Sequence, residues 1–102
     1  MDQGSLHYMV DFTLPKELDE TFVSQIPQQR SMVNRMLGAG QILNYALSLE
    51  NSKLWVVFAA KSTDELMELV DSLPLTPYMK MKISELTFYN AAQSFVPAFS
   101  AN

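Results

Sequence analysis

The central part of the sequence, QILNYALSLENSKLWVVFAA at residues 41–60, predicts a β-hairpin. In its first half, apolar side chains recur at every second position from Leu43 to Leu49, which is typical of a half-buried strand. Residues 53–60 form a second run rich in branched and aromatic residues, and the polar Glu50-Asn51-Ser52 separates the two runs. Two strands joined by so short a turn pair antiparallel. The two runs should therefore form an antiparallel hairpin within a β-sheet.

A helical pattern precedes the hairpin in residues 17–37. Its apolar residues lie three and four positions apart, so they share one face of a helix. They are Phe22, Val23, Ile26, Val33, Met36 and Leu37. Pro27 lacks an N–H and clashes with the preceding turn, so we expect a kink or two helical pieces. Gly38 and Gly40 indicate the helix end, because glycine accepts the left-handed conformation of a C-terminal cap.

A second helix is predicted after the hairpin. Ser62 and Glu65 have the spacing of a capping box, in which the Ser side chain accepts from a free backbone N–H and the Glu reaches back to the cap. Pro74 and Pro77 end this helix, because proline cannot continue it. Its apolar face comprises Leu66, Met67, Leu69, Val70 and Leu73.

Two further strands complete the pattern. Residues 6–13 are rich in aromatic and branched side chains and stop at Leu14-Pro15, and residues 79–86 alternate again. The order strand, helix, strand, strand, helix, strand predicts an α+β, ferredoxin-like βαββαβ fold, with two helices on one face of a four-stranded antiparallel sheet. We expect residues 1–102 to form one domain, with residues 1–5 as a flexible lead-in. Residues 88–102 are too apolar for a free tail and should form an extension that packs on the domain or on a second copy.

The strands present two different faces, because alternate side chains point to opposite sides of a sheet. The nearly apolar set is predicted to lie under the helices: Tyr8, Val10, Phe12, Leu43, Tyr45, Leu47, Leu54, Val56, Phe58, Met79, Met81 and Ile83. The other set mixes apolar and polar side chains: His7, Met9, Asp11, Ile42, Asn44, Ala46, Ser48, Trp55, Val57, Ala59, Lys80, Lys82 and Ser84. A mixed face on a single sheet indicates that a second copy covers it. We therefore expect a homodimeric α+β barrel, open to higher assembly, that encloses a pocket for a small organic ligand.

Composition excludes several classes of protein. Asp and Glu number 11 against 7 Lys and Arg, for a net charge of -4, which argues against nucleic acid or anionic membranes as partners. The absence of Cys excludes disulfides, iron–sulfur clusters and thiol catalysis, and the single His excludes a His-rich zinc or di-iron site within one chain. We expect no metal and no cofactor. The longest apolar run, residues 54–60, is far below the roughly 20 residues of a membrane helix, and no signal-peptide pattern is present, so a cytoplasmic location is expected.

Charged residues on the mixed face are candidates for chemistry. His7 is a candidate general acid or base, because histidine titrates near neutral pH; a purely structural histidine is the alternative. Asp11 lies four residues along the same strand, about 13 Å away, so the two cannot form a dyad. Lys80 or Lys82, on the neighbouring strand, should either pair with Asp11 or hold the carboxylate of a ligand.

Three further residues are candidate ligand contacts. Asn44, Trp55 and Tyr78 could form an aromatic and hydrogen-bonding wall for a planar ligand. The alternative for Trp55 is packing against the second copy.

The segment Leu73-Pro74-Leu75-Thr76-Pro77-Tyr78-Met79 resembles a signature of muconolactone delta-isomerases at the junction of the second helix and the last strand. His7 in the first strand and Leu14-Pro15 at its end agree with that resemblance, as does the order of elements over residues 6–86. The resemblance implies a ferredoxin-like subunit in a dimeric α+β barrel and a cofactor-free allylic proton shift on a small anionic lactone. This chain differs from the family at Met9, where the isomerases carry Lys, and in residues 42–47, where they carry Arg and His.

Three functions remain open at this point. The first is a small-ligand protein, including a cofactor-independent isomerase of a small cyclic or aromatic carboxylate, with His7 as proton carrier and Lys80 or Lys82 for the anion. The second is a non-catalytic binding or assembly module in which the mixed face is only a dimer interface. The third is a cofactor-free oxygenase of the same barrel type.

Overall fold

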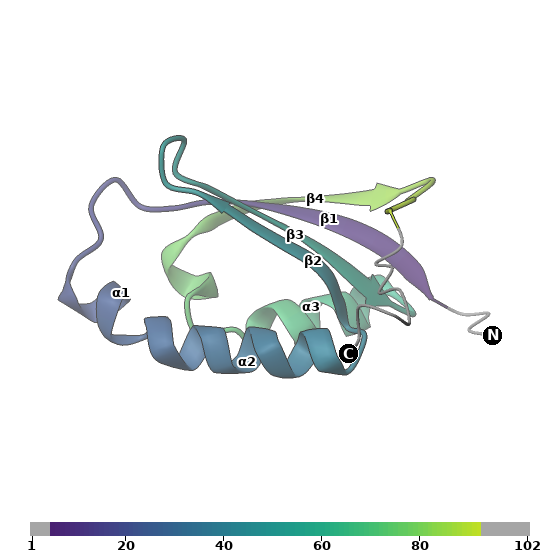
Figure 1. Cartoon of the computed structure of the whole chain (residues 1–102), viewed down its shortest axis with the longest axis horizontal. Coiled ribbons are helices and arrows are strands. Elements are labelled where there is room, and N and C mark those ends of the chain that lie inside the picture. Colours follow the sequence, from purple (N-terminus) through teal and green to yellow (C-terminus); the bar gives the residue numbers. More distant parts are fainter. Residues whose placement is uncertain (1–4, 93–102) are drawn as a thin grey trace, which may run out of the picture.

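The computed structural model describes residues 5–92 and confirms the α+β fold (Figure 1). Its strands are β1 (Leu6–Thr13), β2 (Ile42–Ser48), β3 (Lys53–Ala60) and β4 (Lys80–Leu86). Its helices are α1 (Glu20–Ser24), α2 (Ile26–Gly38) and α3 (Thr63–Asp71), and a short 3-10 turn, η1, covers Thr76–Tyr78. No helix within residues 5–92 has the length and apolar character needed to cross a lipid bilayer.

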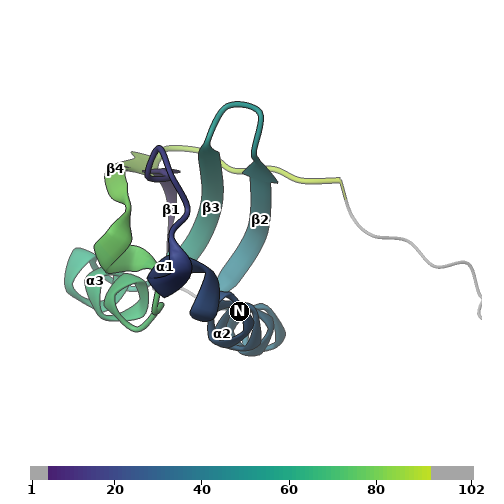
Figure 2. The ribbon, with the colours of Figure 1, turned by 90° about the vertical axis from the view of Figure 1, so that its left-hand side faces the viewer.

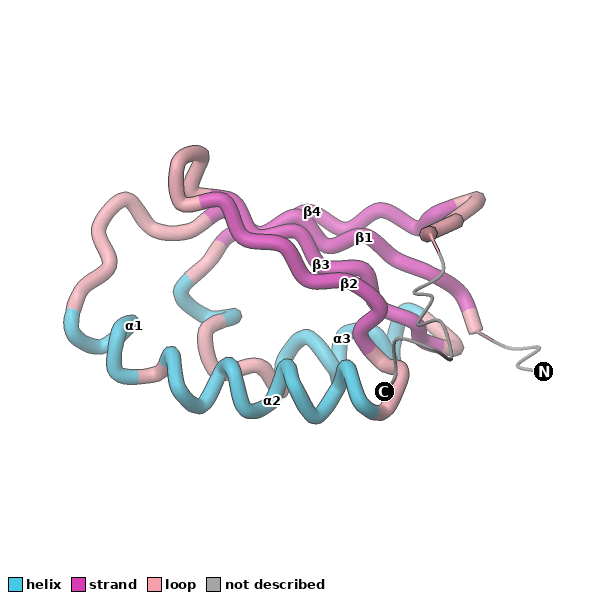
Figure 3. Tube along the Cα trace, in the orientation of Figure 1, coloured by secondary structure: helices cyan, strands magenta, loops and turns pink. Residues whose placement is uncertain are grey.

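The strands form one antiparallel sheet in the order β2-β3-β1-β4 (Figure 3). The β2–β3 hairpin pairs with β1 through β3, so β2 lies at one edge of the sheet and β4 at the other. The three α-helices found within residues 5–92 lie on one side of this sheet. No helix in this part of the chain covers the other side, which is called the open face below (Figure 2). The core lies between the two layers and is centred on Phe12, Phe58 and Leu66, each fully buried.

The first helical region consists of two pieces, as Pro27 predicts. Helix α1 is capped by Asp19, whose side chain accepts from the Phe22 N–H at 2.9 Å. Gln25 separates the two helices, and Pro27 lies in the first turn of α2, where its missing N–H breaks no helical hydrogen bond. Gly40 follows the end of α2 with a φ of 75°, the left-handed conformation expected of a glycine stop.

Helix α3 begins at its predicted cap. The Ser62 side chain accepts from the Glu65 N–H at 3.1 Å. The carboxylate of Glu65 accepts from the N–H of Lys61, one residue before the cap, and not from that of Ser62. This reciprocal pair satisfies two backbone donors at the exposed start of the helix.

A β-bulge corrects the predicted faces at the start of β2. Ile42 pairs with Phe58, but Asn44 pairs with Val57, so Leu43 is an extra residue opposite a single step of β3. The expectation that Ile42 faces away from the helices is wrong: it is 1% exposed and belongs to the core. Beyond the bulge the alternation holds, and Tyr45 faces the helices as predicted.

Candidate functional site

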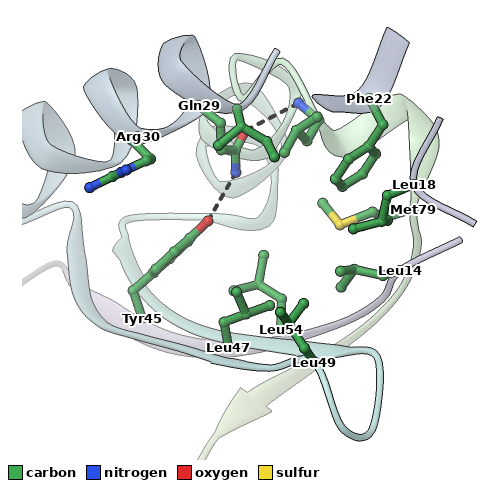
Figure 4. A pocket seen from close by; sticks show the side chains of 12 residues that line it. Leu14, Leu18, Phe22, Gln29, Arg30, Tyr45, Leu47, Leu49, Leu54 and Met79 are labelled. Carbon is green, nitrogen blue, oxygen red and sulfur yellow. Dashed lines mark hydrogen bonds between the residues drawn. The ribbon is translucent and has the colours of Figure 1, made fainter. Parts of the chain in front are cut away.

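A cavity of about 430 Å³ lies between the β2–β3 hairpin and helices α1 and α2 (Figure 4). Nine of its lining side chains are wholly apolar and three carry polar groups. The apolar ones are Leu14, Leu18, Phe22, Ile26, Leu47, Leu49, Leu54, Leu75 and Met79, and the polar ones are Gln29, Arg30 and Tyr45. The cavity is therefore a hydrophobic chamber with few places for a hydrogen bond.

Exposed leucines surround the cavity. Leu47 is 55% exposed, Leu49 is 65% exposed and Leu18 is 40% exposed, although all three also line the chamber. Leu47 and Leu49 come from the end of β2 and the hairpin turn, and Leu18 comes from the loop before α1. Apolar side chains gathered at an opening favour an apolar molecule that covers them.

The polar end of the cavity is a chain of hydrogen bonds through Gln29. This side chain is 2% exposed. Its Oε1 accepts from the backbone N–H of Leu75 at 3.1 Å, and its Nε2 donates to the hydroxyl of Tyr45 at 3.2 Å (Figure 4). Gln29 thus ties α2 to β2 and to the segment that follows α3. The bond to Leu75 is buried, where a lost partner is costly, and the bond to Tyr45 is half-buried.

The hydroxyl of Tyr45 is a neutral donor at physiological pH. Burial raises the pKa of Tyr45 above its ordinary value, and the hydrogen bond from Gln29 opposes only part of that effect. A protonated phenol can donate to a carbonyl or carboxylate oxygen of a ligand.

Arg30 is the charged residue among those lining the cavity. It is exposed and follows Gln29 on α2, and its guanidinium points away from the apolar side chains of the chamber (Figure 4). No ion pair is recorded for Arg30 within residues 5–92. A guanidinium on the rim of an apolar chamber suits a carboxylate that stays near water while its ring is buried.

The open face carries most of the residues expected from the sequence to bind a ligand. In the register of the sheet, Asp11 lies between Trp55 on β3 and Lys82 on β4, and Thr13 lies between Lys53 and Lys80. Asn44 lies on the same face opposite Val57. These residues are therefore neighbours on one surface.

Asp11 pairs with a lysine that sequence reasoning missed. The Nζ of Lys53 lies 3.2 Å from Asp11 Oδ1 and also donates to the Thr13 hydroxyl at 2.9 Å. Lys82 is opposite Asp11, as expected, but it is exposed on an edge strand, where an ion pair gains little. Among residues 5–92, Oδ1 of Asp11 accepts no hydrogen bond, and its ion pair with Lys53 is the interaction it makes.

His7 lies at the end of the open face where the chain leaves β4. Its ring is 5.5 Å from that of Tyr89, at an angle of 57°. Residues 87–92 run from β4 across this end of the sheet towards β2 (Figure 2). Residues 88–92 are the described part of the expected C-terminal extension. Residues 93–102 of that extension and residues 1–4 of the expected lead-in lie outside the described range.

Tyr78 lies apart from Asn44 and Trp55, with which it was expected to form a wall for a planar ligand, but it shares a cleft with Lys80. It lies in η1, where its ring meets the edge of Phe22 at 6.3 Å between centroids. It borders a separate cleft of about 380 Å³ with Lys16 and Lys80. Tyr78 is therefore a neighbour of the cavity wall, whereas His7 and Trp55 lie across the sheet from the cavity.

Comparison with known proteins identifies the family. The sequence model of the muconolactone delta-isomerase family matches residues 6–92. The chain belongs to this family. No curated protein matches it closely enough to count as a relative.

Solved structures share the fold of this family member. A crystal structure of muconolactone isomerase is 20% identical, with a TM-score of 0.67 over 88% of this chain and 97% of that one. A crystal structure of MtbAldR is 15% identical, with a TM-score of 0.56 over 88% of this chain and 58% of that one. At such identities the likeness concerns the fold.

The segment that carried the resemblance to the family builds part of the cavity. Within residues 73–79, Leu75 and Met79 line the chamber, and the N–H of Leu75 is the donor to Gln29. The hydroxyl of Thr76 donates to the Val70 carbonyl at 2.7 Å and so fixes this segment to the end of α3. Among residues 5–92 no three His, Cys, Asp or Glu side chains gather as a metal site would require.

Proposed function

We propose that the protein binds a small cyclic organic acid in the cavity under the β2–β3 hairpin. The observation that carries this proposal is the lining: nine apolar side chains around about 430 Å³, with polar groups from only three residues. An apolar pocket with a few convergent polar groups is the usual form of a small-molecule site. A bound ring would also cover Leu47 and Leu49, which water now reaches.

The residues suggest how such a ligand lies. Its ring packs among the leucines, its carboxylate stays at the rim near Arg30, and a ring or carbonyl oxygen accepts from the Tyr45 hydroxyl. Membership of the muconolactone delta-isomerase family supports muconolactone or a related cyclic acid as the ligand.

The finer proposal is a cofactor-independent isomerase. In a proton shift next to a carbonyl group, negative charge develops on the carbonyl oxygen, and the neutral Tyr45 hydroxyl is placed to stabilise it. Among residues 5–92, the twelve that line the cavity include no Asp, Glu or His. The proton acceptor must therefore come from outside this set, either from a second copy or from elsewhere in the chain.

The open face supports a second candidate site. There a second copy of the chain would close a barrel over His7, Asn44 and Trp55, with His7 as proton carrier and Lys80 or Lys82 holding the anion. The row of Lys82, Asp11 and Trp55 across three strands supports it. The sheet separates this site from the cavity, so one ligand uses one site or the other. In a non-catalytic module the open face would be only an interface, and the protein would bind muconolactone without converting it.

Ligand-induced NMR shifts separate the two sites, because the chain has a single tryptophan. The Trp55 indole N–H reports on the open face, and the methyl groups of Leu47 and Leu54 report on the cavity. Titration with muconolactone or benzoate should shift the leucine methyls and leave the indole signal in place. A saturable shift of the Trp55 signal alone would overturn the cavity in favour of the open face.

A pair of leucines on β2 provides a matched test by mutation. Leu47→Asp puts a charge in the cavity wall and should weaken benzoate binding by about tenfold, about 1.4 kcal/mol, since it also removes apolar contact. Leu43→Asp makes the same change at the bulge, outside the cavity lining, and should bind normally. Equal weakening in both variants would contradict the cavity site.

Turnover is tested separately. Isomerisation of muconolactone in D₂O can be followed by NMR, with Tyr45→Phe and His7→Gln as variants. Loss of turnover in Tyr45→Phe with activity kept in His7→Gln supports the cavity, and the reverse supports the open face. Binding without any isomerisation would establish the non-catalytic module.

A further inference from the structure

The Gln29 network fixes which way the hydrogen bonds at the polar end of the cavity run. The backbone N–H of Leu75 can only donate, so the Gln29 atom facing it must be the carbonyl oxygen, Oε1. The amide nitrogen, Nε2, then faces Tyr45, and the Tyr45 oxygen accepts from it. The hydroxyl hydrogen of Tyr45 consequently points away from Gln29.

The polar groups left for a ligand are mainly donors, because the oxygens of Gln29 and Tyr45 each already accept one hydrogen bond. No acceptor for the Tyr45 hydroxyl is recorded within residues 5–92. Nε2 of Gln29 has a second hydrogen besides the one given to Tyr45, and Arg30 has only donors. A ligand group that only donates would have to share an oxygen that already accepts a hydrogen bond, whereas an acceptor oxygen meets hydrogens that have no other partner.

We infer that Gln29 is a positioning residue that sets the polarity of the site, so that the cavity selects cyclic ligands carrying an acceptor oxygen over ligands carrying an N–H donor. This inference rests on the proposed function, because it assigns a ligand class to the same cavity. Gln29 acts through Tyr45 and through the fixed position of the Leu75 segment. The raised pKa of Tyr45 agrees with it, since the phenol stays a donor at neutral pH.

Three bicyclic molecules of nearly equal size test the selection. Indene has no hydrogen-bonding group, indole has one N–H donor, and 1-indanone has one carbonyl acceptor. Dissociation constants from NMR titration of the full chain should show 1-indanone binding about fivefold tighter than indene, the effect of one net hydrogen bond. Indole should bind no more tightly than indene. In Tyr45→Phe the advantage of 1-indanone over indene should fall below about twofold, while indene binds as before.

Gln29→Glu at mildly alkaline pH tests the positioning role directly. A carboxylate accepts from both Leu75 and Tyr45, so the Tyr45 hydroxyl would donate to residue 29 and turn its lone pairs to the cavity. The preference should then invert, with indole binding more tightly than 1-indanone. Gln28→Glu adds the same charge on the exposed neighbouring residue of α2 and should keep the original order. If Gln29→Glu fails to fold, the three ligands with the wild-type chain and Tyr45→Phe still decide.

The outcomes distinguish this inference from the proposed function. If indene binds as tightly as 1-indanone, or if indole binds most tightly, the inferred preference for acceptor oxygens is wrong. The cavity would still be a ligand site. An unchanged order in a folded Gln29→Glu protein overturns the role of Gln29. No binding of any of the three at millimolar concentration overturns the cavity as a site for rings, and both proposals with it.

Discussion

Replacing Gln29 by Met should destabilise the protein more than any polar-to-apolar change on the surface of α2. Gln29 is nearly completely buried, and its Oε1 is the acceptor for the N–H of Leu75, which is itself buried. Methionine has a similar volume but no comparable acceptor, so that N–H would be left without a partner. An orphaned buried donor costs about 1–3 kcal/mol, and loss of the bond to the half-buried Tyr45 adds about 0.5 kcal/mol because water can replace it.

The expected change in the free energy of unfolding is therefore about 2–3 kcal/mol. In a domain of this size that lowers Tm by roughly 10 °C or more. Urea and thermal unfolding followed by far-UV circular dichroism measure both quantities. Gln28→Met is the matched control, because residue 28 is exposed on the same helix and should change stability by less than about 0.5 kcal/mol.

Tyr45→Phe divides the two contributions. This variant removes the hydrogen bond between Gln29 and Tyr45 and keeps the one between Leu75 and Gln29. It should lower the free energy of unfolding by about 1 kcal/mol at most. A Gln29→Met protein as stable as the Gln28→Met control would refute the reasoning, since it would mean that the Leu75 N–H does not depend on Gln29.

Three further predictions concern other parts of the molecule. Because the folded state holds the Tyr45 proton more tightly than the unfolded state, stability should fall as pH rises above the ordinary value of 10.0, and urea unfolding between about pH 9 and about pH 11 should show a smaller fall in Tyr45→Phe. Ser62→Ala removes the cap of α3 and should cost about 1 kcal/mol in the same unfolding assay, whereas Ser31→Ala, within α2, should not. Sedimentation should give twice the 11.5 kDa chain mass if the open face is a dimer interface, and Trp55→Glu should return the monomer; a monomeric wild type at micromolar concentration would refute the shared barrel.

Most of the fold was predictable because alternation and capping are local signals. Strands β1 and β3 have the bounds that their residue types indicate, and the Ser62 cap starts α3 at the expected place. The face of Ile42 was not predictable, because a bulge depends on how two strands twist against each other and not on the residue types in one of them.

The cavity was harder to foresee because sequence periodicity does not show where two layers separate. The helix-facing set was expected to be a filled core, yet Leu47 is exposed and the chamber lies beside it. The position of Gln29 in the sequence could have indicated the polar end of the cavity. Gln29 lies in the stripe formed by Phe22, Ile26, Val33 and Met36, at the spacing of three and four, and a polar residue in such a stripe indicates a buried hydrogen-bond network.

The partner of Asp11 shows another limit of sequence reasoning. Strand order predicts which residues are opposite one another, and Lys82 is indeed opposite Asp11. The choice between Lys53 and Lys82 depends on side-chain reach and on a second acceptor, the hydroxyl of Thr13. Neither is encoded in the alternation of a single strand.

Because of the bulge at Leu43, the length of β2 can change by one residue while Tyr45 keeps facing the cavity. Deleting this one residue would restore a regular ladder and leave Ile42 and Tyr45 facing the same side, because the bulge supplies the extra step between them. Bulges bend a strand and increase its twist, so the deletion would change the path of the hairpin while keeping its polar group. A change of one residue at this position would thus alter the path of β2 towards the chamber without altering the side of the sheet from which Tyr45 meets it.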